Sequence, residues 1–179
     1  MKKVVSGITV ECRKGDITKQ PDLDAIVNAA NAALMPGGGV SGAIHRAAGA
    51  KLYQKCKPLA PIKTGEAVIT LGCDLPNKHV IHCLGPVYGR DNPSDKLLAD
   101  CYRNALKLAD KEGLKSVGFP AISTGIFGYP AEEAAKVAFK TFIEVIPLLK
   151  SVKNICFVLF DDGSLAIHEK EMLNAFKNS

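Results

Sequence analysis

Apolar residues gather in short segments rich in β-formers, and these alternate with longer amphipathic segments along most of the chain. Short apolar runs bounded by turn residues predict strands, and apolar residues at helical spacing predict helices. The predicted strands are Gly7–Cys12, Ala25–Val27, Ala67–Leu71, His79–Leu84, Ser116–Phe119 and Asn154–Leu159. The predicted helices are Val40–Cys56, Ser94–Glu112, Ala131–Ile146 and Ser164–Phe176.

This alternation predicts an α/β sheet with helices on both faces. Pro130 and the acidic pair Glu132 and Glu133 mark the start of one helix, and Gly113 marks the end of another. The 179 residues contain no repeat and no linker, so we expect residues 1–179 to form a single domain. Ligands of such sheets bind beyond the carboxyl ends of the strands, which directs attention to the loops after Ala25–Val27 and Ser116–Phe119.

Composition narrows the class of protein. The chain is 47% hydrophobic and 23% charged, as globular domains are, and no apolar run approaches a membrane-spanning length. Its six cysteines form no C-x-x-C pair, and no secretion signal precedes them. We therefore expect buried free thiols in a reducing compartment, and a cytoplasmic protein.

A net charge of +5 comes from 19 Lys and 4 Arg spread evenly along the chain. This distribution favours a general attraction for phosphate-bearing ligands over a dedicated nucleic-acid surface, which usually shows clustered arginines and aromatics. Nucleic acid is therefore not an expected partner. The chain is expected to be a monomer.

Two glycine-rich loops carry the candidate chemistry, GGGVSG at 37–42 and STGIFG at 123–128. In each, a short strand runs into glycines and a helix begins nearby, so backbone N–H groups can converge on an anion. Two such loops suggest a diphosphate, although glycine clusters also simply make turns. No Walker motif occurs, and the match to G-x-G-x-x-G at Gly37 lacks the adjacent strand and the later acidic residue.

The runs GDIT at 15–18, IVNAAN at 26–31, GGGVSGAIHRAAG at 37–49 and FPAISTGIFGYP at 119–130 resemble the macrodomain family, and most of all its MacroD-type branch. The resemblance covers nearly the whole chain in family order and spacing. It implies a three-layer α/β/α fold on a central mixed, mostly parallel sheet, with ADP-ribose, free or attached to a protein, lying across one end.

The resemblance also assigns the ends of the ligand. Asp16 should accept a hydrogen bond from the adenine amino group, with the Ile17 backbone nearby, and Phe160 should pack on the adenine. Taken without the resemblance, Asp16 is an ordinary turn or cap residue and Phe160 a core residue at a strand end. Asn31 should hold the distal ribose and position a water near its anomeric carbon, and Phe127 should flank that ribose.

The remaining site residues follow from the same resemblance. The first loop should wrap the diphosphate through the backbone of Gly38, Gly39 and Val40, and Asn28 should brace that loop. The second loop should close over the other side through Ser123, Gly125, Ile126, Phe127 and Gly128.

Histidines suggest no metal site. His79 and His82, beside Cys83, lie on a predicted strand where residues three apart point to opposite faces. His45 lies in a predicted helix with no obvious acidic partner, so packing is its expected role. No metal and no cofactor are expected.

Ser41 leaves two functions open. MacroD-type proteins release ADP-ribose from modified acidic side chains and deacetylate O-acetyl-ADP-ribose, and their pattern has an aspartate where this chain has Ser41. Serine cannot act as a carboxylate base near neutral pH, and a positioned base contributes about 10²–10⁴-fold. The chain is expected to be a hydrolase that uses Asn31, Ser41 and the substrate's own phosphate; the alternatives are a reader without turnover and, less favoured, a module that binds RNA or poly(ADP-ribose).

Overall fold

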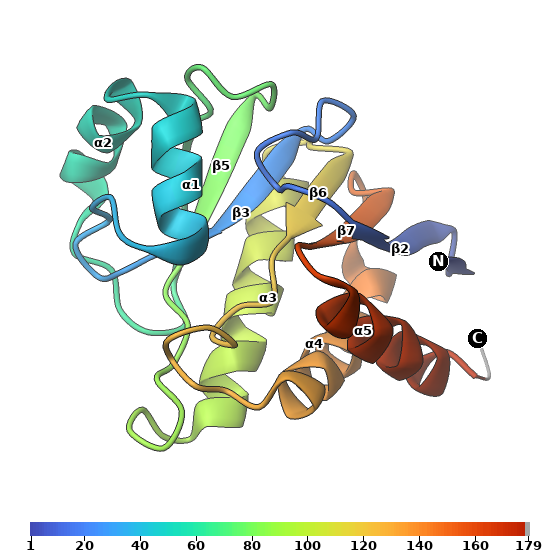
Figure 1. Ribbon diagram of the computed structural model, residues 1–179. Coiled ribbons are helices and arrows are strands. Elements are labelled where there is room, and N and C mark those ends of the chain that lie inside the picture. The colour runs from blue at the N-terminus through green and yellow to red at the C-terminus, as the bar shows by residue number, and fades with distance from the viewer. Residues whose placement is uncertain (178–179) are drawn as a thin grey trace.

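A mixed seven-stranded sheet forms the centre of the computed structural model, which describes residues 1–177 (Figure 1). The strands lie in the order β1-β2-β7-β6-β3-β5-β4. The five inner strands run parallel, and an antiparallel strand closes each edge, so the expected mixed, mostly parallel sheet is confirmed. The strands are β1 (Lys2–Val5), β2 (Ile8–Lys14), β3 (Ala25–Ala29), β4 (Ala67–Leu71), β5 (His79–Cys83), β6 (Ser116–Phe119) and β7 (Asn154–Leu159).

Helices cover both faces of the sheet, which confirms the three-layer arrangement (Figure 1). The first two helices pack on one face over a core that includes Ile26, Ile44 and Val80. The last three pack on the other face over a core rich in aromatic rings, among them Phe119 and Phe142. The α-helices are α1 (Gly39–Ala48), α2 (Lys51–Cys56), α3 (Ser94–Lys111), α4 (Ala131–Val145) and α5 (Asp162–Ala175), with short 3₁₀ turns at Lys57–Leu59 and Ile146–Leu148.

The prediction of one helix over Val40–Cys56 is wrong, because the chain breaks at Gly49. This residue has φ of +81°, a conformation that L-amino acids rarely adopt, and its N–H caps α1 by donating to the carbonyl of His45. A Cβ added to Gly49 would also lie 2.8 Å from the Asp74 carboxylate. The result is two helices, α1 and α2, with different directions.

The strand predicted at Gly7–Cys12 begins one residue later and is preceded by β1, which the sequence did not reveal. Ser6 and Gly7 both have positive φ, 49° and 78°, and make the tight two-residue turn that joins β1 to β2 as an antiparallel hairpin. Gly7 thus belongs to a turn rather than to a strand. Serine in this conformation is uncommon, which is why the turn was not foreseen.

The sheet is weakest between β3 and β6. These strands share only two register pairs, Ala25 with Val117 and Ile26 with Gly118, whereas β3 pairs with β5 over five positions and β2 with β7 over six. The register ends at Ile26 and Gly118, before either strand ends. The two glycine loops follow these two strands.

The cysteines are all free, and five of the six are buried, as expected. Cys73 is the partly exposed exception. Within residues 1–177, no helix combines the length and the apolar character needed to cross a membrane.

Candidate functional site

A groove of about 590 Å³ lies beyond the carboxyl ends of the parallel strands, between α1 and the start of α5. Residues from four segments line it: the loop after β2, the exposed side of α1, the loop after β6 and the junction of β7 with α5. Six predicted binding residues meet in this groove, namely Asp16, Ile17, Gly39, Val40, Gly125 and Phe160.

The start of α1 lines this groove. Gly38 occupies the N-cap, no side chain among residues 1–177 caps the helix, and the first turn contains no acidic residue. The first N–H groups of a helix have no intrahelical partner and carry a partial positive charge. The first glycine loop therefore presents an anion-binding surface to the groove.

Neither packing nor backbone conformation accounts for two of the loop glycines. A Cβ added to Gly38 or Gly125 would meet no atom within 4 Å, and neither residue needs the left-handed backbone conformation. Gly39 differs, because its φ of +54° favours glycine. The backbone of Gly38 and of Gly125 is therefore open to close approach by another molecule.

Asp16 makes a local turn through one carboxylate oxygen, and the other has no hydrogen-bond partner among the described residues 1–177. Its Oδ1 accepts from the Thr18 hydroxyl at 2.7 Å and from the Thr18 N–H at 2.9 Å. The Thr18 hydroxyl and then the Thr18 N–H hold the pKa of Asp16 below its ordinary value. The carboxylate is therefore charged at neutral pH, with Oδ2 available to accept from a ligand amino group.

Phe160 does not belong to the core. Its side chain is 82% exposed and lines the groove directly after β7, so the interpretation of Phe160 as a core residue is wrong. The next residue, Asp161, caps α5 by accepting from the Ser164 N–H at 2.7 Å. This cap fixes the point where the strand ends and the aromatic ring leaves the sheet.

Asn31 is clamped to the backbone of its own loop. Its Nδ2 donates to the Met35 carbonyl, and the Met35 N–H donates to its Oδ1, both at 2.9 Å. Each amide atom retains one further hydrogen-bonding position, a second N–H and a second lone pair. The side chain is therefore oriented in advance and can still bind a hydroxyl or a water.

The second glycine loop folds back on itself. The Tyr129 N–H donates to the Ser123 carbonyl at 2.9 Å and the Gly128 N–H to the Gly125 carbonyl at 3.0 Å, with Ser123 and Gly128 both at positive φ. This geometry leaves the Ile126 side chain completely exposed at the tip of the loop, and it half-buries Phe127.

Asn28 lies on β3 itself, fully buried, rather than in the loop. His82 is the register partner of Asn28 on the neighbouring strand β5, and Nδ2 of Asn28 lies 3.0 Å from its Nδ1. Nε2 of His82 lies 2.9 Å from the Thr70 hydroxyl. An amide N–H can only donate, so Nδ1 of His82 accepts and Nε2 carries the proton. Both ring nitrogens are thus engaged.

This arrangement predicts a pH-dependent stability. Burial, and to a lesser degree the charge of His45, lowers the pKa of His82 to about 3. A histidine in the unfolded chain has a pKa of about 6.5. Between these values only the unfolded chain binds the proton, so the stabilisation is complete above the unfolded pKa and is lost as the pH falls.

We expect His82 to contribute a slope of about 1.4 kcal/mol per pH unit to the free energy of unfolding in this range. His82→Gln should be less stable at pH 7 and should flatten the curve by that amount. Urea unfolding at several pH values between 3.5 and 7 would measure both. Parallel curves for the two proteins would contradict the assignment.

Ser41 and His45 lie one turn apart on the buried side of α1, 5% and 6% exposed. Neither the Ser41 hydroxyl nor Nε2 of His45 has a hydrogen-bond partner in the part of the chain that the structure describes. Burial lowers the pKa of His45, so its imidazole is neutral at pH 7. Ser41 is therefore buried in the first turn of α1, and within residues 1–177 no carboxylate accepts a hydrogen bond from its hydroxyl.

Arg46 is a groove residue that the sequence did not single out. It lines the groove together with Gly39 and Ala43, at helical spacing on one side of α1. Across residues 1–177 its guanidinium takes part in no ion pair. The helical spacing of Gly39, Ala43 and Arg46 is the sequence feature that indicates a position for Arg46 beside the first glycine loop.

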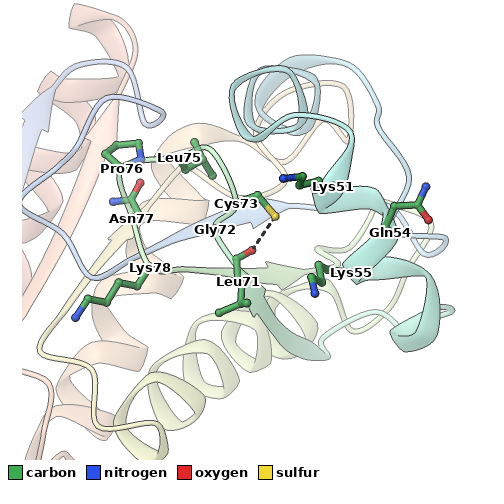
Figure 2. A pocket seen from close by; sticks show the side chains of 10 residues that line it. All are labelled: Lys51, Gln54, Lys55, Leu71, Gly72, Cys73, Leu75, Pro76, Asn77 and Lys78. Atoms are coloured by element: carbon green, nitrogen blue, oxygen red, sulfur yellow. Dashed lines mark hydrogen bonds between the residues drawn. The ribbon is translucent and has the colours of Figure 1, made fainter.

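A second hollow, of about 640 Å³, lies between α2 and the turn from β4 to β5 (Figure 2). This turn leads into the start of β5 and so lies at the opposite end of the sheet from the carboxyl ends of the parallel strands (Figure 1). The hollow therefore lies far from the groove. Lys51 and Lys55 come from α2, while Lys78 points away from that helix (Figure 2). The hollow contains none of the predicted site residues.

Comparison with known proteins gives a consistent result. The sequence model described as the Macro domain matches residues 27–138. A Macro domain-containing protein of Chlorobaculum tepidum is 46% identical over 166 residues, covering 92% of this chain and 96% of that protein. A protein of Klebsiella pneumoniae named O-acetyl-ADP-ribose deacetylase is 46% identical over 161 residues, covering 87% and 91%.

Solved structures agree. The Oceanobacillus iheyensis macrodomain with ADP superposes with a TM-score of 0.95 at 38% identity, covering all of this chain and 97% of that one. The Trypanosoma brucei macrodomain in complex with ADP-ribose has a TM-score of 0.83 at 39% identity, covering 90% and 68%.

Proposed function

This chain belongs to the macrodomain family, and we propose that it binds ADP-ribose in the groove and hydrolyses esters of its distal ribose. The observation that carries the proposal is the uncapped start of α1 beside glycines that the fold itself does not require. Adenine would lie between Asp16 and Phe160, and the diphosphate between the two glycine loops. The names of the Klebsiella relative and of the Trypanosoma complex support the ligand and the reaction class.

In the proposed reaction, Asn31 holds the distal ribose and orients a water toward the anomeric carbon. In a modified protein, the water oxygen bonds to that carbon, the bond to the acceptor carboxylate breaks, and a proton of the water passes to the diphosphate. In O-acetyl-ADP-ribose the ester joins the acetyl group to a ribose hydroxyl, so the water oxygen bonds to the acetyl carbonyl carbon instead, the ribose oxygen leaves and takes up the proton, and acetate is released. A carboxylate is a good leaving group, so a weak base is enough. Ser41 assists only by orientation, because its hydroxyl is neutral and buried.

Turnover tests this proposal. A protein mono-ADP-ribosylated on glutamate, and separately O-acetyl-ADP-ribose, should each be hydrolysed by the chain and not by Asn31→Ala. Calorimetric titration should show ADP-ribose binding in the micromolar range or tighter. Absence of binding would end the proposal, whereas binding without turnover would leave the reader, which the serine at position 41 favours.

Ser41→Asp examines the base. If the substrate phosphate accepts the proton, the variant should change kcat less than about tenfold, because a second base adds little. A missing general base would instead give a rise of about 10²–10⁴-fold. Ser41→Asn, which has the same shape as Asp but no charge, is the matched control for packing around this buried position.

A further inference from the structure

Three exposed apolar side chains lie on loops at the end of the sheet that holds the groove, and one of them, Ile126, directly follows the groove residue Gly125. They are Met35, Tyr88 and Ile126, here called the apolar rim, and they are 46%, 43% and 100% exposed. Each lies on a loop that follows one of the adjacent parallel strands β3, β5 and β6. These loops therefore lie together at the carboxyl end of the parallel strands (Figure 1).

Direct contacts join the rim to the residues assigned to the distal ribose. Met35 exchanges two hydrogen bonds with the Asn31 side chain. The Tyr88 N–H donates to the Phe127 carbonyl at 2.9 Å, and the Tyr88 ring packs on Tyr129 with centroids 4.8 Å apart. Met35 and Tyr88 of the rim are thus direct neighbours of Asn31 and Phe127, the two residues assigned to the distal ribose.

No part of ADP-ribose at this end of the groove is apolar enough to explain the apolar rim. The ligand ends in a polar sugar, which gains little from Met, Tyr and Ile side chains outside the groove. A single exposed apolar residue is ordinary, but several around one opening indicate a surface that another molecule covers. Continuity with the groove identifies the covering molecule, because whatever is attached to the distal ribose must emerge between these loops.

We infer that the apolar rim is the docking surface for the acceptor polypeptide of an ADP-ribosylated protein, in the residues next to the modified side chain. This inference rests on the proposed function and extends it to the substrate class. A polypeptide can reach Met35 and Tyr88 while its modified carboxyl group lies at Asn31. An acetyl group on free ADP-ribose has two carbons and is too short to do so.

The double variant Met35→Ser/Tyr88→Ser tests the inference, because the bonds of Met35 to Asn31 and of Tyr88 to Phe127 use backbone atoms, which both substitutions keep. For a mono-ADP-ribosylated protein, KM should rise about tenfold, as the loss of moderate interface contacts does. For O-acetyl-ADP-ribose, kcat/KM should stay within about twofold, and so should the Kd of free ADP-ribose. Leu71→Ser is the matched control, because Leu71 is 55% exposed at the far end of the sheet.

Each other outcome counts against the inference. An unchanged KM for the protein substrate would overturn it, and equal losses for both substrates and for ADP-ribose would place the two side chains in the groove. Sedimentation showing a wild-type dimer that the double variant loses would assign the rim to a second copy of the chain. If the wild type binds ADP-ribose without turnover, the same comparison is made with the Kd of the modified protein, so hydrolysis can fail independently of the rim.

Discussion

Asn31→Ala is expected to lower kcat/KM for ADP-ribosyl ester hydrolysis by about 10²–10³-fold while leaving the protein folded. The substitution removes the proposed contact to the distal ribose and the water. It also removes both hydrogen bonds to Met35, so the loop that positions the first glycine run loses its clamp. Catalysis depends on sub-ångström placement, which is why two modest bonds give a large effect.

Release of ADP-ribose under single-turnover conditions would measure this loss. Asn104→Ala is the matched control, since Asn104 also donates to a backbone carbonyl, that of Gly65, and lies on α3 rather than in a loop next to the glycine runs. Its kcat/KM should stay within about twofold of wild type. An Asn31→Ala protein that kept a third or more of the wild-type value would remove Asn31 from the mechanism.

Gly42→Ala is expected to weaken ADP-ribose binding by about 10–100-fold and to lower the free energy of unfolding by about 1–3 kcal/mol. A Cβ at this position would lie 2.5 Å from the Gly37 carbonyl oxygen and 3.0 Å from Nη1 of Arg46. Arginine can move aside, but the carbonyl belongs to the backbone of the first loop. The loop must therefore shift away from the helix start whose N–H groups it presents.

Helix propensity acts in the opposite direction, because alanine is better than glycine within α1 by about 1 kcal/mol. A loss of affinity in Gly42→Ala would hence come from the displaced loop. Ala47→Gly, at an exposed position of the same helix, makes the reverse change without contacting the loop. Calorimetry should show that Ala47→Gly binds ADP-ribose with a Kd within about twofold of the wild-type value. Equal Kd values for Gly42→Ala and the wild type would contradict the proposed shift of the loop.

Much of this fold was predictable from local patterns. The alternation of apolar and amphipathic segments predicts all but the first strand, and glycines at strand ends mark both loops. What escaped prediction depends on long-range contacts or on unusual backbone. The break at Gly49 and the turn at Ser6 need positive φ, which an amphipathic pattern does not reveal.

The residues of the candidate site also fall into a predictable group and a group that only the folded structure reveals. Motif residues such as Asp16, Val40 and Phe160 do converge on one groove. The clamp between Asn31 and Met35 and the ion-pair-free Arg46 follow from loop conformation and helix orientation, which only the folded chain fixes. The roles assigned to individual residues in holding the ligand remain predictions for the variants above.

The short pairing of β3 with β6 has a consequence for how the protein responds to its ligand. With two register pairs, this is the seam along which the sheet would open first, and the glycine loops lie on opposite sides of it. A molecule that contacts both loops links the part of the sheet containing β2 and β7 to the part containing β5 and β4, and so stabilises the pairing of β3 with β6. Bound protein should then exchange its β3 and β6 amide hydrogens with deuterium more slowly, far beyond the loops that the ligand touches.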